Sequence, residues 1–164
     1  MMKIDVLVAD YGNGGHSQDM SMLLNCYAQD TMGGGQELPV YVKENLAAEL
    51  SKVPGAFSIL CYVDGKPAGL ANCFEGFSTF RCKPLFNIHD VVVEQAFRGL
   101  GISQLMLQKV EELAVERGCC KLTLEVLEGN KVAQNAYIKF GYGGYELDPI
   151  MGKAMFWEKG LSNS

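Results

Sequence analysis

The chain passes from a strand to a helix through residues 91–103, VVVEQAFRGLGIS. An apolar triplet is followed by a turn with two glycines, and the turn leads into an amphipathic helix that begins near residue 102. A turn of this kind presents several backbone N–H groups at a helix N-terminus, where a phosphate is held well. The segment therefore predicts a site for a phosphate-bearing ligand.

Length and composition predict one globular domain over residues 1–164. The 164 residues are 48% hydrophobic and 20% charged, with a formal net charge of -5, and a chain of this length buries a substantial core. Neither a signal peptide nor an apolar run of about 18 residues is present, so we expect a cytoplasmic protein without a membrane partner. The negative charge argues against nucleic acid as a partner.

Cysteine and histidine spacing gives no sign of a metal site. The six cysteines form no Cys-x-x-Cys pair, and the two histidines, His16 and His89, lie far apart in the sequence. Cys61 and Cys73 fall in apolar, strand-like runs, where cysteine usually acts as a small buried hydrophobic residue. We expect reduced thiols and no bound metal.

Hydrophobic periodicity predicts ten elements in the order β-α-α-β-β-β-α-β-α-β. A glycine-rich loop at 10–15 precedes the first helix, the glycines at 33–35 follow it, and Asp64-Gly65 predicts a tight hairpin turn. The predicted strands are 4–9, 57–63, 67–77, 85–93, 121–127 and 155–159, and the predicted helices are 16–28, 39–50, 102–117 and 131–140. This order indicates an α/β fold with a mostly antiparallel first half and a crossover in the second.

Two motifs resemble the GNAT superfamily of acetyl-CoA-dependent N-acetyltransferases. Residues 98–103, RGLGIS, are similar to the family's Arg/Gln-x-x-Gly-x-Gly/Ala turn, and residues 130–142, NKVAQNAYIKFGY, are similar to its C-terminal helix motif. The last turn position holds Ser103, which is also small and can cap a helix. A dinucleotide-binding fold is disfavoured because its glycine motif would follow the first strand.

The resemblance implies a GNAT-like mixed central sheet with helices on both faces and two splayed strands that bind CoA. The pantetheine arm would pair with the strand edge at Val91 and Val93, and the pyrophosphate would lie on the backbone amides of the turn. The implied cofactor-binding residues are Val91, Val93, Arg98, Gly99, Leu100, Gly101, Ile102, Ser103, Asn130 and Ala133. Asn130 would contact the pantetheine arm or simply cap its helix, and Arg98 would serve the cofactor or be a solvated surface residue.

The same resemblance assigns the catalytic roles. Tyr137 would be the general acid that protonates the departing CoA thiolate, with a purely structural aromatic residue as the alternative. His89 is the first choice for the general base because imidazole takes up a proton near neutral pH, although it could instead be structural. Asp90 is second and Glu125 third. Strand alternation predicts that His89 and Asp90 face opposite sides of the sheet.

The acceptor site is less well defined by the sequence. The connection 33–39 could act as a lid or be a plain loop. Residues 74–80 and 88–90 resemble the diamine and polyamine branch of the superfamily, although that branch typically carries a glutamate at the position of His89. A cluster of aromatic residues could line an acceptor cavity or belong to the core, and it consists of Phe74, Phe77, Phe80 and Phe86.

These features predict a metal-free N-acetyltransferase that moves an acetyl group from acetyl-CoA to a primary amine by direct attack in a ternary complex. The acceptor would be a small molecule or a peptide amine. A catalytic cysteine is disfavoured, since no cysteine has a histidine partner placed by a motif. The alternative function is a catalytically inactive acyl-CoA-binding sensor or regulatory module. The resemblance also implies a homodimer, with residues 150–151 and 155–157 as candidate interface segments.

Overall fold

The computed structural model describes residues 1–162, and the side chains of all of these except 146 and 147. Its centre is a five-stranded sheet in the order β1-β2-β3-β4-β5. Neighbouring strands are antiparallel, apart from the parallel pair β4 and β5. The strands are β1 (Ile4–Val8), β2 (Ala56–Val63), β3 (Lys66–Ser78), β4 (Lys83–Val93) and β5 (Leu122–Leu124). The predicted α/β fold with a mixed central sheet is confirmed.

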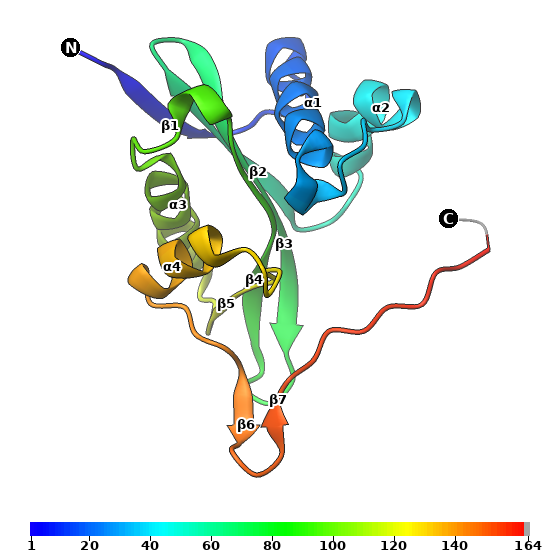
Figure 1. Cartoon of the computed structure of the whole chain (residues 1–164), viewed down its shortest axis with the longest axis vertical. Coiled ribbons are helices and arrows are strands. Elements are labelled where there is room, and N and C mark those ends of the chain that lie inside the picture. The colour runs from blue at the N-terminus through cyan, green and yellow to red at the C-terminus, as the bar shows by residue number, and fades with distance from the viewer. Residues whose placement is uncertain (163–164) are drawn as a thin grey trace.

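Helices cover both faces of this sheet, as predicted (Figure 1). On one face, α1 (Gly14–Gln29) and α2 (Val40–Leu50) enclose a core around Met20 and Leu70. On the other face, α3 (Ile102–Arg117) encloses a larger core around Met106, and α4 (Lys131–Lys139) packs beside it. Short 3₁₀ turns precede α2 at Thr31–Gly33 and α3 at Gln95–Phe97. Within the described residues, no helix has the length and apolar character needed to cross a membrane.

Local sequence signals account for most element ends. The Asn13 side chain accepts a hydrogen bond from the backbone N–H of His16, so α1 begins two residues before its predicted start at 16. Asp64 and Gly65 both have positive φ, at 49° and 78°, as a two-residue hairpin turn requires. Gly118 ends α3 in the left-handed conformation.

One irregularity in β4 changes the direction of the side chains along the strand. Ile88 is opposite Cys73 and Asp90 is opposite Asn72, so His89 is an extra residue that bulges out of the ladder. Before the bulge, Ile88 faces the α3 side, and after it Val91 and Val93 pack on that side. The bulge therefore resets the alternation of the strand by one residue.

The parallel pairing of β4 and β5 stops where this bulge begins. Its last pair is Ile88 with Leu124, while β4 runs on to Val93 beside β3 alone. The prediction of a strand over 121–127 is therefore too long, because residues 125–127 have no neighbouring strand with which to pair. Within residues 1–162, the edge of β4 that faces β5 has no strand partner from residue 89 to residue 93. This separation of β4 and β5 matches the predicted splaying of two central strands.

The predicted last strand at 155–159 is wrong. The chain instead forms a separate hairpin from β6 (Glu146–Asp148) and β7 (Gly152–Lys153), and residues 154–160 have no strand pairing. A short apolar run becomes a strand only beside another strand, and this tail runs away from the sheet (Figure 1). Its large side chains at 155–157 are 77–82% exposed.

The contact between Gly33 and α1 gives a prediction about stability. A Cβ atom at residue 33 would lie 1.9 Å from the carbonyl oxygen of Tyr27, which is backbone and cannot turn aside. We expect Gly33→Ala to reduce the free energy of unfolding by about 3 kcal/mol and to lower the Tm by roughly 10 °C. Gly14→Ala is the control because a Cβ there meets nothing within 4 Å. Equal Tm values for the two variants in a thermal melt would contradict this packing.

Candidate active site

A groove of about 680 Å³ lies between the end of β4, the loop before α3, the first turns of α4 and the end of α1. Nine of the ten predicted cofactor-binding residues line it, the exception being Leu100. They are Val91, Val93, Arg98, Gly99, Gly101, Ile102, Ser103, Asn130 and Ala133. The fold thus brings the two sequence motifs together on the walls of one groove.

The N-terminus of α3 opens into this groove. Gly99 and Gly101 have φ values of +83° and +77°, a conformation that side chains other than glycine rarely adopt. A Cβ at either position would meet no other atom of the protein within 4 Å. No side chain caps the helix, so its first N–H groups are free of a side-chain acceptor. The turn is therefore shaped by backbone conformation, with open space in front of it.

Asn130 and Arg98 both make structural contacts at the groove. The Asn130 side chain accepts a hydrogen bond of 3.2 Å from the backbone N–H of Ala133 and so caps α4. The Arg98 guanidinium lies 3.7 Å from the Asp30 carboxylate at the end of α1. Both side chains of this ion pair are largely exposed, so its contribution to stability is small.

Tyr137 lines the groove from α4 and also packs against the core on the α3 side. Burial raises the pKa of its phenol above the ordinary tyrosine value, and the nearby Tyr27 adds to the effect. A raised phenol pKa keeps the hydroxyl protonated near neutral pH. The phenol is thus protonated at the wall of the groove, while its ring also fills the structural role that was the alternative.

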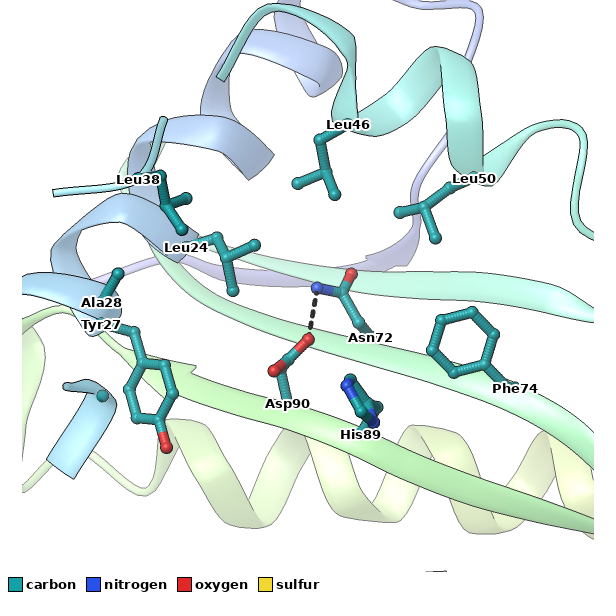
Figure 2. Close-up of a pocket in the computed structure, with 11 residues that line it drawn as sticks. Leu24, Tyr27, Ala28, Leu38, Leu46, Leu50, Asn72, Phe74, His89 and Asp90 are labelled. Carbon is teal, nitrogen blue, oxygen red and sulfur yellow. Dashed lines mark hydrogen bonds between the residues drawn. The ribbon is translucent and has the colours of Figure 1, made fainter. Parts of the chain in front are cut away.

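A second cavity, of about 360 Å³, lies on the opposite side of β4 beneath α1 and α2. Both His89 and Asp90 line it (Figure 2). The prediction that these two side chains face opposite sides of the sheet is wrong, because the bulge at His89 interrupts the strand alternation. The two candidate bases therefore belong to one cavity.

Asp90 and His89 differ in how firmly they are held. One carboxylate oxygen of Asp90 accepts a hydrogen bond of 3.0 Å from the Asn72 amide, which is 3% exposed (Figure 2). The His89 ring is exposed and makes an edge-to-face contact with Phe74, with ring centroids 5.6 Å apart. The structure thus fixes the carboxylate by a buried polar contact and the imidazole by an aromatic neighbour.

Tyr27 lines both cavities and was not predicted as a site residue. Burial raises the pKa of its phenol, and the charges of Asp90 and Asp30 raise it further. Asn72 was missed as well, although an asparagine within the apolar strand segment LANCF is a detectable signal. Tyr27 gave no such signal because it lies on the apolar stripe of α1, where an aromatic residue is expected to be part of the hydrophobic core.

The other candidate acceptor residues fall in different places. Phe74 lines the smaller cavity, whereas Phe86 is buried in the core and Phe77 and Phe80 are 58% and 94% exposed. Glu125 is exposed, lines neither cavity and accepts a hydrogen bond of 3.4 Å from Asn87.

The connection over 33–39 is tied to α1 at several points. The backbone N–H of Gly35 donates to Asp30, that of Gln36 donates to Ala28, and that of Leu38 donates to the side chain of Asn25. Gly33 and Leu38 also line the smaller cavity. The segment therefore forms part of the cavity wall, and its role as a lid stays a prediction.

Neither buried cysteine lines a cavity, whereas the exposed Cys26 lines the groove. Burial raises the pKa of the Cys73 thiol to about 12 and that of Cys61 to about 11, so neither forms a thiolate near neutral pH. Among the described residues, no three His, Cys, Asp or Glu side chains cluster as a metal site. Metal-free chemistry stays a prediction.

Two solved structures share the fold at low sequence identity. A probable acetyltransferase superposes with a TM-score of 0.80 and 18% identity, covering 96% of this chain and 99% of that one. An aminoglycoside N-acetyltransferase in complex with CoA superposes with a TM-score of 0.73 and 16% identity, covering 97% and 96% of the two chains.

Sequence comparison finds relatives at higher identity than these two structures. Thialysine N-epsilon-acetyltransferase of Bos taurus is 32% identical over 108 residues, 66% of this chain and 59% of that protein. The matching protein of Sus scrofa is 31% identical over 58% of this chain, and 53% of its own length is covered. The chain thus spans 53–59% of the length of these relatives. The model of the acetyltransferase (GNAT) family matches residues 20–142, most of the chain, and the chain therefore belongs to the GNAT acetyltransferase family.

Proposed function

We propose that the protein transfers the acetyl group of acetyl-CoA to a primary amine by direct attack within a ternary complex. The observation that carries this proposal is the pair of cavities on the two sides of β4, which share Tyr27 as a lining residue. Val91 lines the groove, while its neighbour Asp90 lines the smaller cavity. Two substrates, one in each cavity, would thus meet at the end of a single strand.

The groove has the features that CoA needs along its length. The unpaired edge of β4 at residues 91–93 would hydrogen-bond the pantetheine arm as an added strand. The amides of residues 98–103, at the positive end of the α3 dipole, would hold the pyrophosphate. Asn130 and Ala133 would form the opposite wall. Arg98 would exchange its exposed contact with Asp30 for the phosphates.

The proposed reaction uses three side chains. The lone pair of the amine nitrogen attacks the thioester carbonyl carbon, the carbon–sulfur bond breaks, and CoA leaves as a thiolate. The protonated phenol of Tyr137 donates its proton to that sulfur. His89 takes the proton that the amine nitrogen loses, directly or through a water. Asp90 would bind the acceptor as its ammonium form. That ammonium loses one proton to water before the attack, which frees the lone pair, and the proton lost after the attack passes to His89. Asp90 is the second choice for the base.

Known relatives support an amine as the acceptor. The Bos taurus relative is a thialysine N-epsilon-acetyltransferase, and the CoA-bound neighbour in fold is an aminoglycoside N-acetyltransferase. Direct attack is supported by adjoining cavities that leave room for both substrates at once. The alternative is a protein that binds acyl-CoA without transferring the acetyl group. The position of Tyr137 on the wall of the groove, where a general acid is expected, speaks against it.

We also propose that the chain forms a homodimer. The large apolar side chains at residues 150, 151 and 155–157 support this, because they are exposed to solvent. A contiguous exposed apolar surface commonly marks a protein–protein interface. The cytoplasmic location stays a prediction from the sequence.

The acid and base assignments are tested by Tyr137→Phe and His89→Ala. Each removes one proton-transfer group, so we expect kcat to fall by roughly 100-fold in either variant. The affinity for acetyl-CoA should stay within about 2-fold, since neither change touches the turn at 98–103. Glu125→Ala is the control and should retain wild-type turnover. Full turnover in both active-site variants, measured as thiol release, would contradict the proposed mechanism.

The cofactor site is tested by Gly101→Glu. A carboxylate in front of the α3 N-terminus would repel a pyrophosphate and fill the open space there. We expect acetyl-CoA affinity to fall by at least about 100-fold in calorimetry. Gly101→Ala has the same positive φ without the charge and should lose less, while Gly144→Glu adds the same charge elsewhere and should bind normally. Equal affinity in all four proteins would overturn this site.

A further inference from the structure

The smaller cavity has a composition that suits one kind of amine. Its ceiling comes from α1 and α2 and is almost wholly hydrocarbon, and its floor carries the polar groups of β3 and β4 (Figure 2). The apolar lining residues are Leu24, Ala28, Leu38, Leu46, Leu50 and Phe74. Asp90 is the single carboxylate among the lining residues, and neither lysine nor arginine lines the cavity.

A buried chain of hydrogen bonds fixes the Asp90 carboxylate at this floor. Ser58, which is 0% exposed, donates its hydroxyl hydrogen to the Asn72 side-chain oxygen over 2.6 Å. Its one hydrogen is thereby used, so the Tyr11 hydroxyl, 2.9 Å away, must be the donor to Ser58. Asn72 then presents its amide N–H groups to Asp90 over 3.0 Å. Donors and acceptors alternate in one consistent direction from Tyr11 to Asp90.

This direction determines what Asp90 can do. Asn72 donates to Oδ2 of the carboxylate, which therefore acts as an acceptor. Within residues 1–162, Oδ1 receives no hydrogen bond. Asp90 thus has one oxygen held by the protein and one available to a ligand. An ammonium group is the natural partner for a fixed carboxylate oxygen.

From these observations we infer that the acceptor is a monocationic primary amine carrying an apolar chain or ring. This inference rests on the proposed function. The ammonium would lie on Asp90, next to the cofactor strand, and the hydrocarbon would lie beneath α1 and α2. A polyamine or an aminoglycoside would bring further ammonium groups against a hydrocarbon wall, and a free amino acid would bring a carboxylate with no lysine or arginine to meet it.

The test compares two amines that differ by one charged group, n-pentylamine and 1,5-diaminopentane. Binding of each to the CoA-saturated protein is measured by calorimetry, and acetylation of each by thiol release. We expect n-pentylamine to bind at least about 10-fold more tightly, because the second ammonium lacks a carboxylate. Equal or tighter binding of the diamine, or no binding of either, overturns the inference.

A variant of the cavity wall sharpens the comparison. Leu46→Glu adds a second carboxylate to the hydrocarbon ceiling and should shift the preference toward 1,5-diaminopentane by at least about 10-fold. Val40→Glu is the control, since it adds the same charge to the same helix at a position that is 63% exposed and lines neither cavity. An unchanged preference in Leu46→Glu contradicts the proposed location of the amine chain.

The transferase activity and the ligand class are refuted by different results. Binding of n-pentylamine without any acetylation refutes the proposed transferase and leaves the ligand class standing. Acetylation of 1,5-diaminopentane or kanamycin in preference to n-pentylamine supports the transferase and refutes the ligand class.

Ser58 is a positioning residue in this scheme, since it contacts Asn72 and does not line the cavity. We expect Ser58→Ala to weaken n-pentylamine binding by about 10-fold while acetyl-CoA affinity stays unchanged. Cys61→Ala is the control for packing loss, because Cys61 is equally buried on the same strand but faces the α3 side. If both variants lower the Tm and neither weakens amine binding, the hydrogen-bond chain does not position Asp90.

Discussion

The single-residue bulge at His89 is the constraint on which both cavities depend. It turns His89 and Asp90 to the same side of the sheet and sends Val91 and Val93 to the other. It also coincides with the end of the pairing between β4 and β5, which leaves the strand edge beyond it unpaired. One extra residue thus separates the side of the smaller cavity from the side of the groove along a single strand.

The smaller cavity combines an apolar ceiling with a polar floor whose hydrogen-bonding groups are paired with one another. Ser58 and Asn72 are buried, and leaving either without partners would cost about 1–3 kcal/mol. The chain from Tyr11 to Asp90 removes that cost and holds the carboxylate in one orientation. A charge held by buried groups needs no rearrangement when a ligand arrives, which favours affinity and selectivity together.

Much of this arrangement could be predicted from the sequence. The helices, strands and glycine turn depend mainly on residues close together in the sequence, so local patterns identify them. These patterns are the glycines of the turns, which have positive φ, the capping asparagine at residue 130 and the periodic apolar stripes. The bulge was not predicted: the segment NIHDV interrupts the apolar alternation with two successive polar residues, but only the pairing with β3 shows which residue is extra. The strand predicted at 155–159 failed for the same reason: its pattern fits a strand, but no neighbouring strand accompanies it.

Hydrogen exchange with and without acetyl-CoA tests the central claim most directly. If the unpaired edge of β4 and the α3 turn hold the cofactor, amides in residues 91–93 and 98–104 should become strongly protected on binding, while those in 154–160 should not change. Protection that is absent from both segments, or confined to other parts of the chain, would show that the opening between β4 and β5 is not the cofactor site.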